Sequence, residues 1–418
     1  MDLSFEQTES HDGVDGNQNE RPTLDAEQEV SPTPSPAFEL TDRQVVKQMV
    51  ESHPCFPVRY TDESKWLRWD SMRWQHVNED AVKRALLRCN EEYMEGLDEG
   101  DVERLELCHK LDDTGSRLLS LTKTVDDIVM DGNLLDKRSE LLNCANGAVD
   151  LRIGVLHPHD MGHYLTQVAL AEYQPDAECP EFMAFLERTF EGDSELIAYV
   201  LTVLGYSMTG DTGEQIFWVW YGPTGQNGKS VLANILRVLL GRDYYSEADS
   251  KTLCGGEGHV PNDVARLKDC RFLSCREPKQ NAKLNESLVK SLVGQDAPPA
   301  RFLRQEYFEF EPKFKLHMLT NYLPEAGNSD AIWRRIRVLP FNVRIPDSER
   351  RTNLAQYLVQ KEGPGILALL VKGAVKYFNE GLKEPKAVLE ATEAYRQSQL
   401  ETFPQSNVDS TAGSDFIT

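Results

Sequence analysis

The sequence predicts an α/β fold built on a parallel-type central sheet, and two observations support this prediction. The first is an apolar run at 217–220 that enters a glycine-rich turn, after which apolar residues recur at helical spacing from 230 to 240. The second is a set of later strand candidates, at 270–275, 314–319 and 336–341, with helical segments between them. Strands that alternate with helices in this way form the sheet of an α/β nucleotide-binding domain.

The glycine-rich turn has the features of a phosphate-binding loop. Backbone N–H groups of a tight turn at a helix N-terminus bind phosphate oxygens, and a lysine there adds a full positive charge. We therefore expect Lys229 on the β- and γ-phosphates of ATP and Ser230 on Mg²⁺. The complete set of expected nucleotide contacts is Gly222, Pro223, Thr224, Gly225, Gln226, Asn227, Gly228, Lys229, Ser230 and Val231.

The spacing of this turn departs from the usual pattern. Five residues separate Gly222 from Gly228, whereas the standard loop has about four. The loop is one residue longer, or it is counted from a different turn. The alternative interpretation is a glycine-rich strand-to-helix turn that binds no ligand.

The composition limits the classes of protein to which the chain can belong. The chain has 418 residues, 40% of them hydrophobic, which is enough for more than one core. An apolar run of membrane-spanning length and a signal peptide are both missing, so we expect a cytoplasmic protein without a membrane partner. The eight cysteines form no Cys-x-x-Cys pair, and His157, His159 and His163 read as a turn after a strand, so we expect no zinc site.

Charge is concentrated at the N-terminus. The net charge of −23 argues against a generally basic nucleic-acid-binding surface, although a local basic channel is compatible with it. Residues 1–38 hold nine acidic residues and one arginine, so we expect a disordered acidic tail there. Residues 403–418 are polar and small, and are expected to form a flexible tail.

Between the two tails, the patterns divide the chain into four parts. We expect a small α+β region at 39–130, a helical domain at 131–205, a nucleotide-binding domain at 206–345 and a helical lid at 346–402. In the first part, Trp66, Trp69 and Trp74 lie in a predicted hairpin among basic residues. They could stack on bases, but packing in a small sheet is the favoured interpretation.

ATP hydrolysis needs an acid, a polar group near the γ-phosphate and a positive charge for the transition state. The strand at 271–276 delivers Glu277 to the sheet edge where ligands bind, so Glu277 is the expected acid and a second Mg²⁺ ligand. Arg276 stands where a paired acid often occurs, which leaves metal positioning to Ser230 and water. A solvated glutamate at a strand end is the alternative.

Two further groups complete the expected site. Thr320 and Asn321 end the next strand, and Asn321 can hydrogen-bond the γ-phosphate or the attacking water. Arg334, Arg335 and Arg337 precede the last strand, and one of them is expected to reach the site of a neighbouring subunit.

These blocks, in this order, resemble the superfamily III helicase domain of phage, plasmid and poxvirus-type primase-helicases. The motifs are the phosphate loop, Arg276-Glu-Pro278, Leu288 to Asp296, Thr320-Asn-Tyr-Leu-Pro324 and Asp330 to Phe341, and the resemblance covers roughly residues 130–400. It implies an AAA+ core, a ring that is usually a hexamer, ATP between subunits, single-stranded or forked DNA in the pore, and 3′ to 5′ movement.

The resemblance also gives a role to the segment around 300–310. Family members project a hairpin from this position into the pore, which makes Arg301 and Arg304 the expected DNA contacts, with Lys290 on the preceding helix a weaker one. The alternative is a surface hairpin with solvated charges.

The resemblance therefore implies a ring-forming ATP-driven DNA helicase that replicates a phage, plasmid or satellite element in a bacterial or phage-infected cell. Too few residues precede the match for a primase, and a winged-helix domain after it is not expected, so a separate primase or origin-binding protein is an expected partner. The main alternative is an ATP-dependent ring that acts as a scaffold or switch without unwinding. A small-molecule kinase fits the later motifs poorly.

Overall fold

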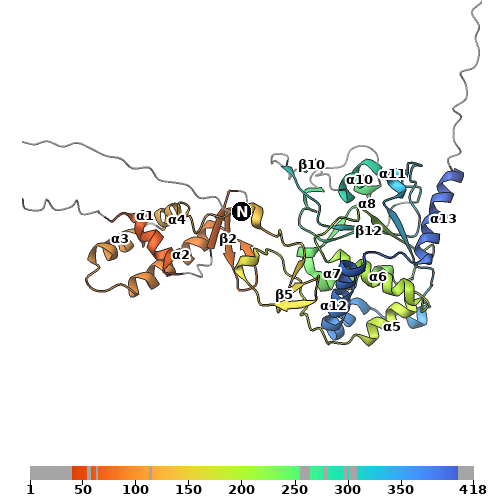
Figure 1. Cartoon of the computed structure of the whole chain (residues 1–418), viewed down its shortest axis with the longest axis horizontal. Helices are drawn as coiled ribbons and strands as arrows, with labels where there is room; N and C mark the ends of the chain where they lie inside the picture. Colours follow the sequence, from red (N-terminus) through yellow and green to blue (C-terminus); the bar gives the residue numbers. More distant parts are fainter. Residues whose placement is uncertain are drawn as a thin grey trace, which may run out of the picture.

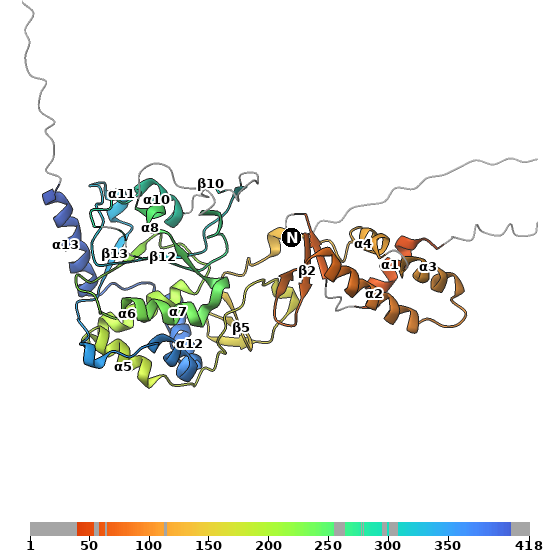
Figure 2. The same ribbon diagram turned by 180° about the vertical axis from the view of Figure 1, so that it is seen from behind.

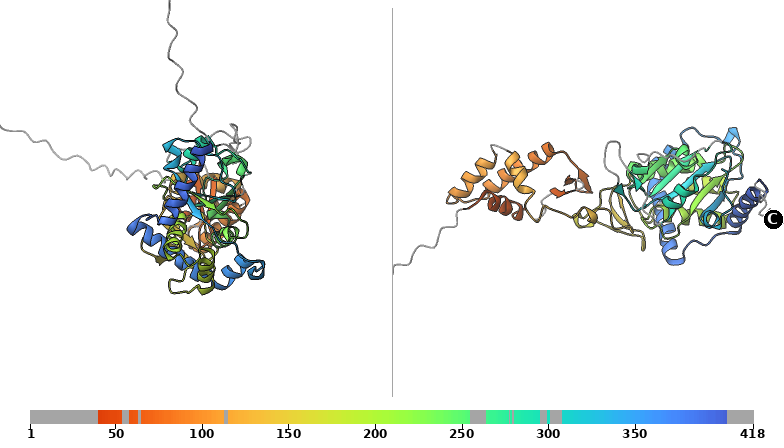
Figure 3. Two further views of the ribbon diagram at one scale, coloured as in Figure 1. Left: turned by 90° about the vertical axis from the view of Figure 1, so that its right-hand side faces the viewer. Right: turned by 90° about the horizontal axis from the view of Figure 1, so that it is seen from above.

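The computed structural model describes residues 40–53, 58–62, 65–112, 115–254, 264–276, 278, 280–294, 299–300 and 308–402. Four helices from the N-terminal part of the chain lie at one end of an elongated molecule and an α/β body at the other (Figure 1). Two small antiparallel sheets lie between them, and the same arrangement is seen from behind in Figure 2 and from above in Figure 3.

The N-terminal unit combines four helices with a small sheet. The helices are α1 (Asp42–Glu51), α2 (Glu79–Glu95), α3 (Val102–Asp112) and α4 (Ser116–Thr122), and the strands are β1 (Val58–Thr61), β2 (Lys65–Trp69) and β3 (Trp74–His76). Thr41 and Gln44 form a capping box that starts α1. Trp66 and Trp74 are each 1% exposed, so the packing interpretation of these residues is confirmed.

A second antiparallel sheet leads into the body. Its strands are β4 (Leu141–Cys144), β5 (Gly147–Asp150) and β6 (Val155–His157). The amide of Asn143 donates to the carbonyls of Met72 and Gln167, which joins this sheet to the N-terminal unit. His159 Nδ1 lies 3.0 Å from Oδ1 of the same asparagine, so this histidine has a structural role.

The body contains a five-stranded sheet whose strands are all parallel. The spatial order is β13-β7-β12-β9-β8, and the strands are β7 (Phe217–Tyr221), β8 (Tyr245–Ala248), β9 (Phe272–Arg276), β12 (Lys315–Thr320) and β13 (Ile336–Pro340). The predicted α/β fold with a parallel sheet is confirmed. The strand β7, which precedes the glycine-rich turn, lies between β13 and β12. The turn therefore follows an interior strand of the sheet and not an edge strand.

Alternation along the strands explains the layers. In β7, Trp218 and Trp220 face one hydrophobic core, whereas Phe217 and Val219 face the other. The first core is covered by α5 (Pro180–Thr189), α6 (Ser194–Ser207), α7 (Lys229–Tyr244) and α12 (Leu354–Glu380). The second is covered by α8 (Ser250–Leu253), α10 (Glu286–Val293), α11 (Asp330–Trp333) and α13 (Lys386–Thr402).

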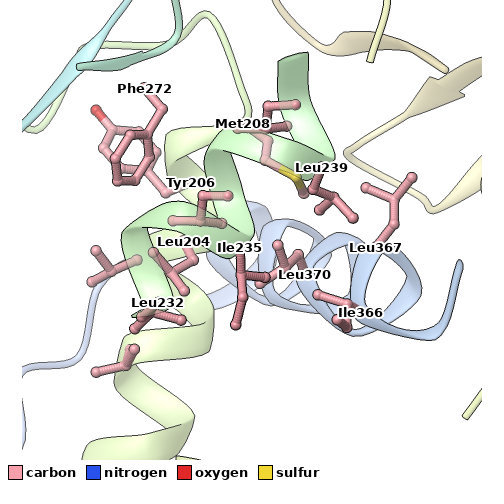
Figure 4. Packing of buried hydrophobic residues seen from close by; sticks show 14 of the residues in the cluster. Leu204, Tyr206, Met208, Leu232, Ile235, Leu239, Phe272, Ile366, Leu367 and Leu370 are labelled. Atoms are coloured by element: carbon pink, nitrogen blue, oxygen red, sulfur yellow. The ribbon is translucent and has the colours of Figure 1, made fainter. Parts of the chain in front are cut away.

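Helix α12 packs unusually close to α6. A Cβ on Gly205 would lie 2.2 Å from the backbone nitrogen of Ala374, and one on Gly373 would lie 2.2 Å from the carbonyl oxygen of Leu201. The missing side chains let the helices touch, and leucine and isoleucine residues of α6, α7 and α12 fill the space around the contact (Figure 4). This packing fixes α12 against α6.

The helical C-terminal region predicted from the sequence is present. Helix α12 continues through Pro364 and stops at Gly381, which has a positive φ of 70°. The boundaries proposed for the separate domains stay predictions. Among the described residues, none of the helices is both long enough and apolar enough to cross a membrane.

Candidate functional site

The glycine-rich turn occupies 222–228, between the end of β7 and the start of α7. Position 222 requires a glycine because neighbouring atoms lie very close to its backbone. A Cβ there would lie 2.5 Å from the Phe341 carbonyl oxygen and 2.9 Å from Lys229 Nζ. Gly228 has a φ of 86° and directly precedes the helix. The backbone N–H of Ile345 donates to the Gln226 carbonyl at 2.8 Å, which ties the turn to the chain after β13.

Lys229 joins this turn to the neighbouring strand. Its Nζ donates to Oδ1 of Asn321 at 2.9 Å and to the carbonyl of Gly222 at 3.2 Å, and the lysine is only 6% exposed. Asn321 directly follows β12, where the strand partner of Thr320 is Tyr221. The structure therefore brings together two of the residues that the sequence proposed for catalysis.

The first turn of α7 presents unpaired donors. The backbone N–H groups of Gly228, Ser230 and Val231 donate to none of the described residues, as the first amides of a helix cannot bond within it. Ser230 is exposed beside them. Such a group of amides next to a lysine ammonium can bind an anion of the size and charge of a polyphosphate.

A pocket of about 690 Å³ opens beside these amides. Phe185 of α5 and Leu354 and Leu358 of α12 form its apolar part, and Ser230 and Val231 line it from the turn side. Its volume lies within the usual range for small-molecule sites, about 300–1,000 Å³. The pocket can receive the nucleoside of a ligand whose phosphates lie on the turn.

Charged residues surround the mouth of this pocket. Arg188 Nε donates to Oε2 of Glu349 at 2.8 Å, and this hydrogen bond raises the pKa of Arg188. Glu181 accepts a hydrogen bond from Lys361, and that bond holds the pKa of Glu181 below its ordinary value. Both carboxylates are thus neutralised by cations at the rim.

A buried carboxylate holds the two walls of the pocket together. Glu362 of α12 is 6% exposed and accepts hydrogen bonds from the backbone N–H groups of Glu181 and Phe182, at 3.0 and 2.9 Å. It therefore caps the start of α5 from a distant helix. The sequence analysis missed this wall, because helical periodicity identifies α5 and α12 but does not pair them.

The three candidate arginines differ in their surroundings: Arg334 and Arg335 precede β13, whereas Arg337, predicted before the strand, lies within it. Arg337 Nε forms an ion pair with Glu384, and Nη1 of Arg335 donates to the Ala331 carbonyl at 2.8 Å. Arg334 is exposed, and its side chain has no hydrogen bond or ion pair within the described part of the chain. Of the three side chains, that of Arg334 is available to an incoming group.

Four further residues that the sequence predicted for the site are Glu277, Lys290, Arg301 and Arg304. Glu277, Arg301 and Arg304 lie outside the described residues. Lys290 of α10 donates to Glu286 at 2.8 Å, within its own helix. Arg276, which replaces the paired acid, donates to Oδ1 of Asn234 on α7 at 2.9 Å.

Residues 46–191 match the family described as D5 N terminal like. The chain is 30% identical over 302 residues to "Putative helicase L207/L206" of Acanthamoeba polyphaga mimivirus, covering 66% of this chain and 31% of the relative. It is 31% identical over 169 residues to "Putative helicase 022R" of Frog virus 3 (isolate Goorha), covering 38% of this chain and 17% of the relative. The chain thus spans less than a third of the length of these relatives.

Among solved structures, the apo C-terminal region of NrS-1 aligns with a TM-score of 0.44 and 13% identity, covering 61% of this chain and 64% of that one.

Proposed function

The chain belongs to the primase-helicase type of family, and from this premise we propose that it is an ATP-driven DNA helicase that translocates on single-stranded DNA. The observation that carries the proposal is the contact between Lys229 and Asn321 beside the unpaired amides of α7. A helicase-like role is also supported by the names of the viral relatives.

In the proposed site, ATP places its phosphates on the turn from Gly222 to Ser230 and its nucleoside in the pocket between α5 and α12. Lys229 neutralises charge on the β- and γ-phosphates. Asn321 holds the lysine before ATP binds and then orients the attacking water. When Mg²⁺ is bound it stabilises charge on the phosphate oxygens, and Ser230 and Glu277 are the proposed ligands.

A ring of subunits, most simply a hexamer, completes this site. Arg334 is the proposed residue that one subunit extends to the ATP of the next, because Arg337 is already paired with Glu384 and Arg334 is exposed. Single-stranded or forked DNA passes through the ring in the 3′ to 5′ direction, gripped by Arg301 and Arg304. A separate primase or origin-binding protein remains a proposed partner, and the phage, plasmid or satellite context stays a prediction.

The main competing function is an ATP-dependent ring that binds DNA or a partner without separating strands. The test is ATP-dependent displacement of a labelled strand from forked DNA with a 3′ or a 5′ tail, with Lys229→Ala as control. Displacement that prefers the 3′ tail and is lost in the variant supports the helicase. Hydrolysis stimulated by DNA without displacement would favour the scaffold.

A further inference from the structure

A basic groove lies between the N-terminal unit and the body. It has a volume of about 600 Å³, and its walls come from β3, the segment at 166–167, the end of α7 and the turn at 265–270. Its lining includes the cations Arg73, Arg242, Arg266 and Lys268 against two acids, Asp243 and Asp269. A local excess of positive charge is notable in a chain whose net charge is −23.

One of the two acids is already neutralised. Arg73 forms an ion pair with Asp243, and the backbone N–H of Val168 donates to the same carboxylate at 3.1 Å. Arg73 also donates to the carbonyl of Thr166 at 3.3 Å. These bonds hold Arg73 in the wall of the groove and pair its charge. The positive charge available to a ligand therefore comes from the remaining cations.

Arg242 and Arg266 are the cations that a ligand can reach. Both are exposed, and the side chain of neither one forms a hydrogen bond or ion pair within the described part of the chain. Gly241, with a φ of 69°, breaks α7 just before Arg242. On the facing turn, Ala265 and Leu267 are buried on either side of Arg266, which leaves that arginine pointing outward.

The groove continues into a neighbouring pocket. A second pocket of about 350 Å³ shares His76, Lys268 and Asp269 with it. This second pocket is also lined by Glu309 at the end of β11 (Phe308–Glu309). Its lining holds more acids, including Asp136 and Glu311, so phosphate binding is assigned to the first groove.

The groove and the nucleotide pocket lie at opposite edges of the sheet. Arg242 precedes β8 and Lys268 precedes β9, whereas the glycine-rich turn follows β7, and the strands are parallel. Five residues of strand separate the two edges, which is about 16 Å. A ligand in the groove therefore does not touch bound ATP.

We propose that this groove binds the phosphate backbone of single-stranded DNA through Arg242 and Arg266, as a contact additional to the pore hairpin. Guanidinium groups match phosphate geometry and stay charged at every working pH. Phosphate contacts carry no base information, so binding is independent of sequence. The inference rests on the proposed function, since it is that function which supplies the DNA.

The test is the affinity of the full chain for a labelled thymidine oligonucleotide, measured by fluorescence anisotropy across a salt series. In the double variant Arg242→Ala/Arg266→Ala, we expect affinity on the order of tenfold weaker and a salt slope reduced by about 1.4, since each contact contributes about 0.7 on single strands. The control is Lys383→Ala/Lys386→Ala, which removes two exposed positive charges at the far end of the body.

The readouts separate this proposal from the proposed function. ATP hydrolysis without DNA should be the same in the double variant and the wild type, because the groove lies away from the nucleotide pocket. Unchanged affinity and slope in the double variant would overturn the groove assignment even if the chain is a helicase. An equal loss in the control would also overturn it, since general charge would then explain the effect. A wild-type chain without ATP hydrolysis would instead reject the proposed function.

Discussion

The side chain of Asn321, directly after β12, accepts a hydrogen bond at 2.9 Å from Nζ of Lys229, the first residue of α7. The lysine is therefore held in place before any phosphate arrives, and ordering it on binding costs less free energy. This contact makes the positions of the two residues depend on each other.

Lys229→Ala should lower ATP hydrolysis by about 100-fold or more, because it removes the positive charge aimed at the phosphates. Asn321→Ala should keep nucleotide binding within a few-fold of wild type and still lower the hydrolysis rate, because it leaves the charge of Lys229 and removes the amide proposed to orient the attacking water. Steady-state hydrolysis and binding of a fluorescent ATP analogue measure the two effects. Normal hydrolysis in Asn321→Ala would remove it from the site.

The pocket between α5 and α12 should set affinity for the nucleoside part of ATP. Ala184 is exposed and lines this pocket, so Ala184→Trp should fill it and weaken ATP binding by about tenfold, equivalent to about 1.4 kcal/mol. Inorganic tripolyphosphate should bind both proteins equally, because it needs only the turn and Lys229. Calorimetry with the two ligands measures this, and equal losses for both would place the nucleoside elsewhere.

Local sequence was sufficient for one half of this site and insufficient for the other. Lys229 and Ser230 lie in one contiguous motif, and its conformation depends on residues that are neighbours in the chain. A strand, turn and helix could therefore be predicted around them. The pocket is lined by Phe185 of α5 and Leu358 of α12, and these helices are joined by Glu362, which caps α5, while glycines let α12 approach α6. Periodicity predicts that such helices are buried, but it contains no information on which helices pair.

The candidate arginines also show that local sequence does not predict contacts between residues distant in the chain. The sequence does not distinguish the three candidates Arg334, Arg335 and Arg337. The ion pair of Arg337 with Glu384, a residue distant in the chain, is visible only in the structure. The strand order is similar, because alternation predicts a parallel sheet and does not place β7 between β13 and β12.

Arg337→Ala should reduce stability, since it breaks an ion pair whose side chains are 21% and 20% exposed and removes a donor to the Arg334 carbonyl. A loss of about 1–3 kcal/mol is expected. Arg334→Ala should change stability by less than about 0.5 kcal/mol, as expected for an exposed residue. Thermal unfolding of the two variants makes this comparison.

If Arg334 acts on the neighbouring subunit's ATP, mixing Arg334→Ala with Lys229→Ala protein should restore part of the hydrolysis that each has lost. A mixed ring contains some interfaces with both an intact lysine and an intact arginine. The mixture is titrated at constant total protein, and Lys229→Ala mixed with buffer is the control. Activity that stays at the sum of the two variants at every ratio would count against shared sites.

A buried histidine should make stability depend on pH. Trp220 Nε1 donates to His317 Nδ1 at 3.1 Å, so the ring proton lies on Nε2, which is 2.9 Å from Ser207 Oγ. A second proton would have to lie on Nδ1, facing the indole N–H. Burial, with a smaller effect from the charge of Lys315, lowers the pKa of His317 well below its usual range.

Because the pKa of His317 is lower in the folded than in the unfolded chain, its neutral form stabilises the fold above about pH 6.5 and that stability is lost as pH falls below it. The variant His317→Gln keeps an acceptor and a donor but cannot titrate. Its deficit in free energy of unfolding relative to wild type should therefore shrink by up to about 1.4 kcal/mol for each pH unit below about 6.5. Urea unfolding of both proteins from neutral to mildly acidic pH measures the deficit, and a constant value would show that His317 is protonated equally in both states.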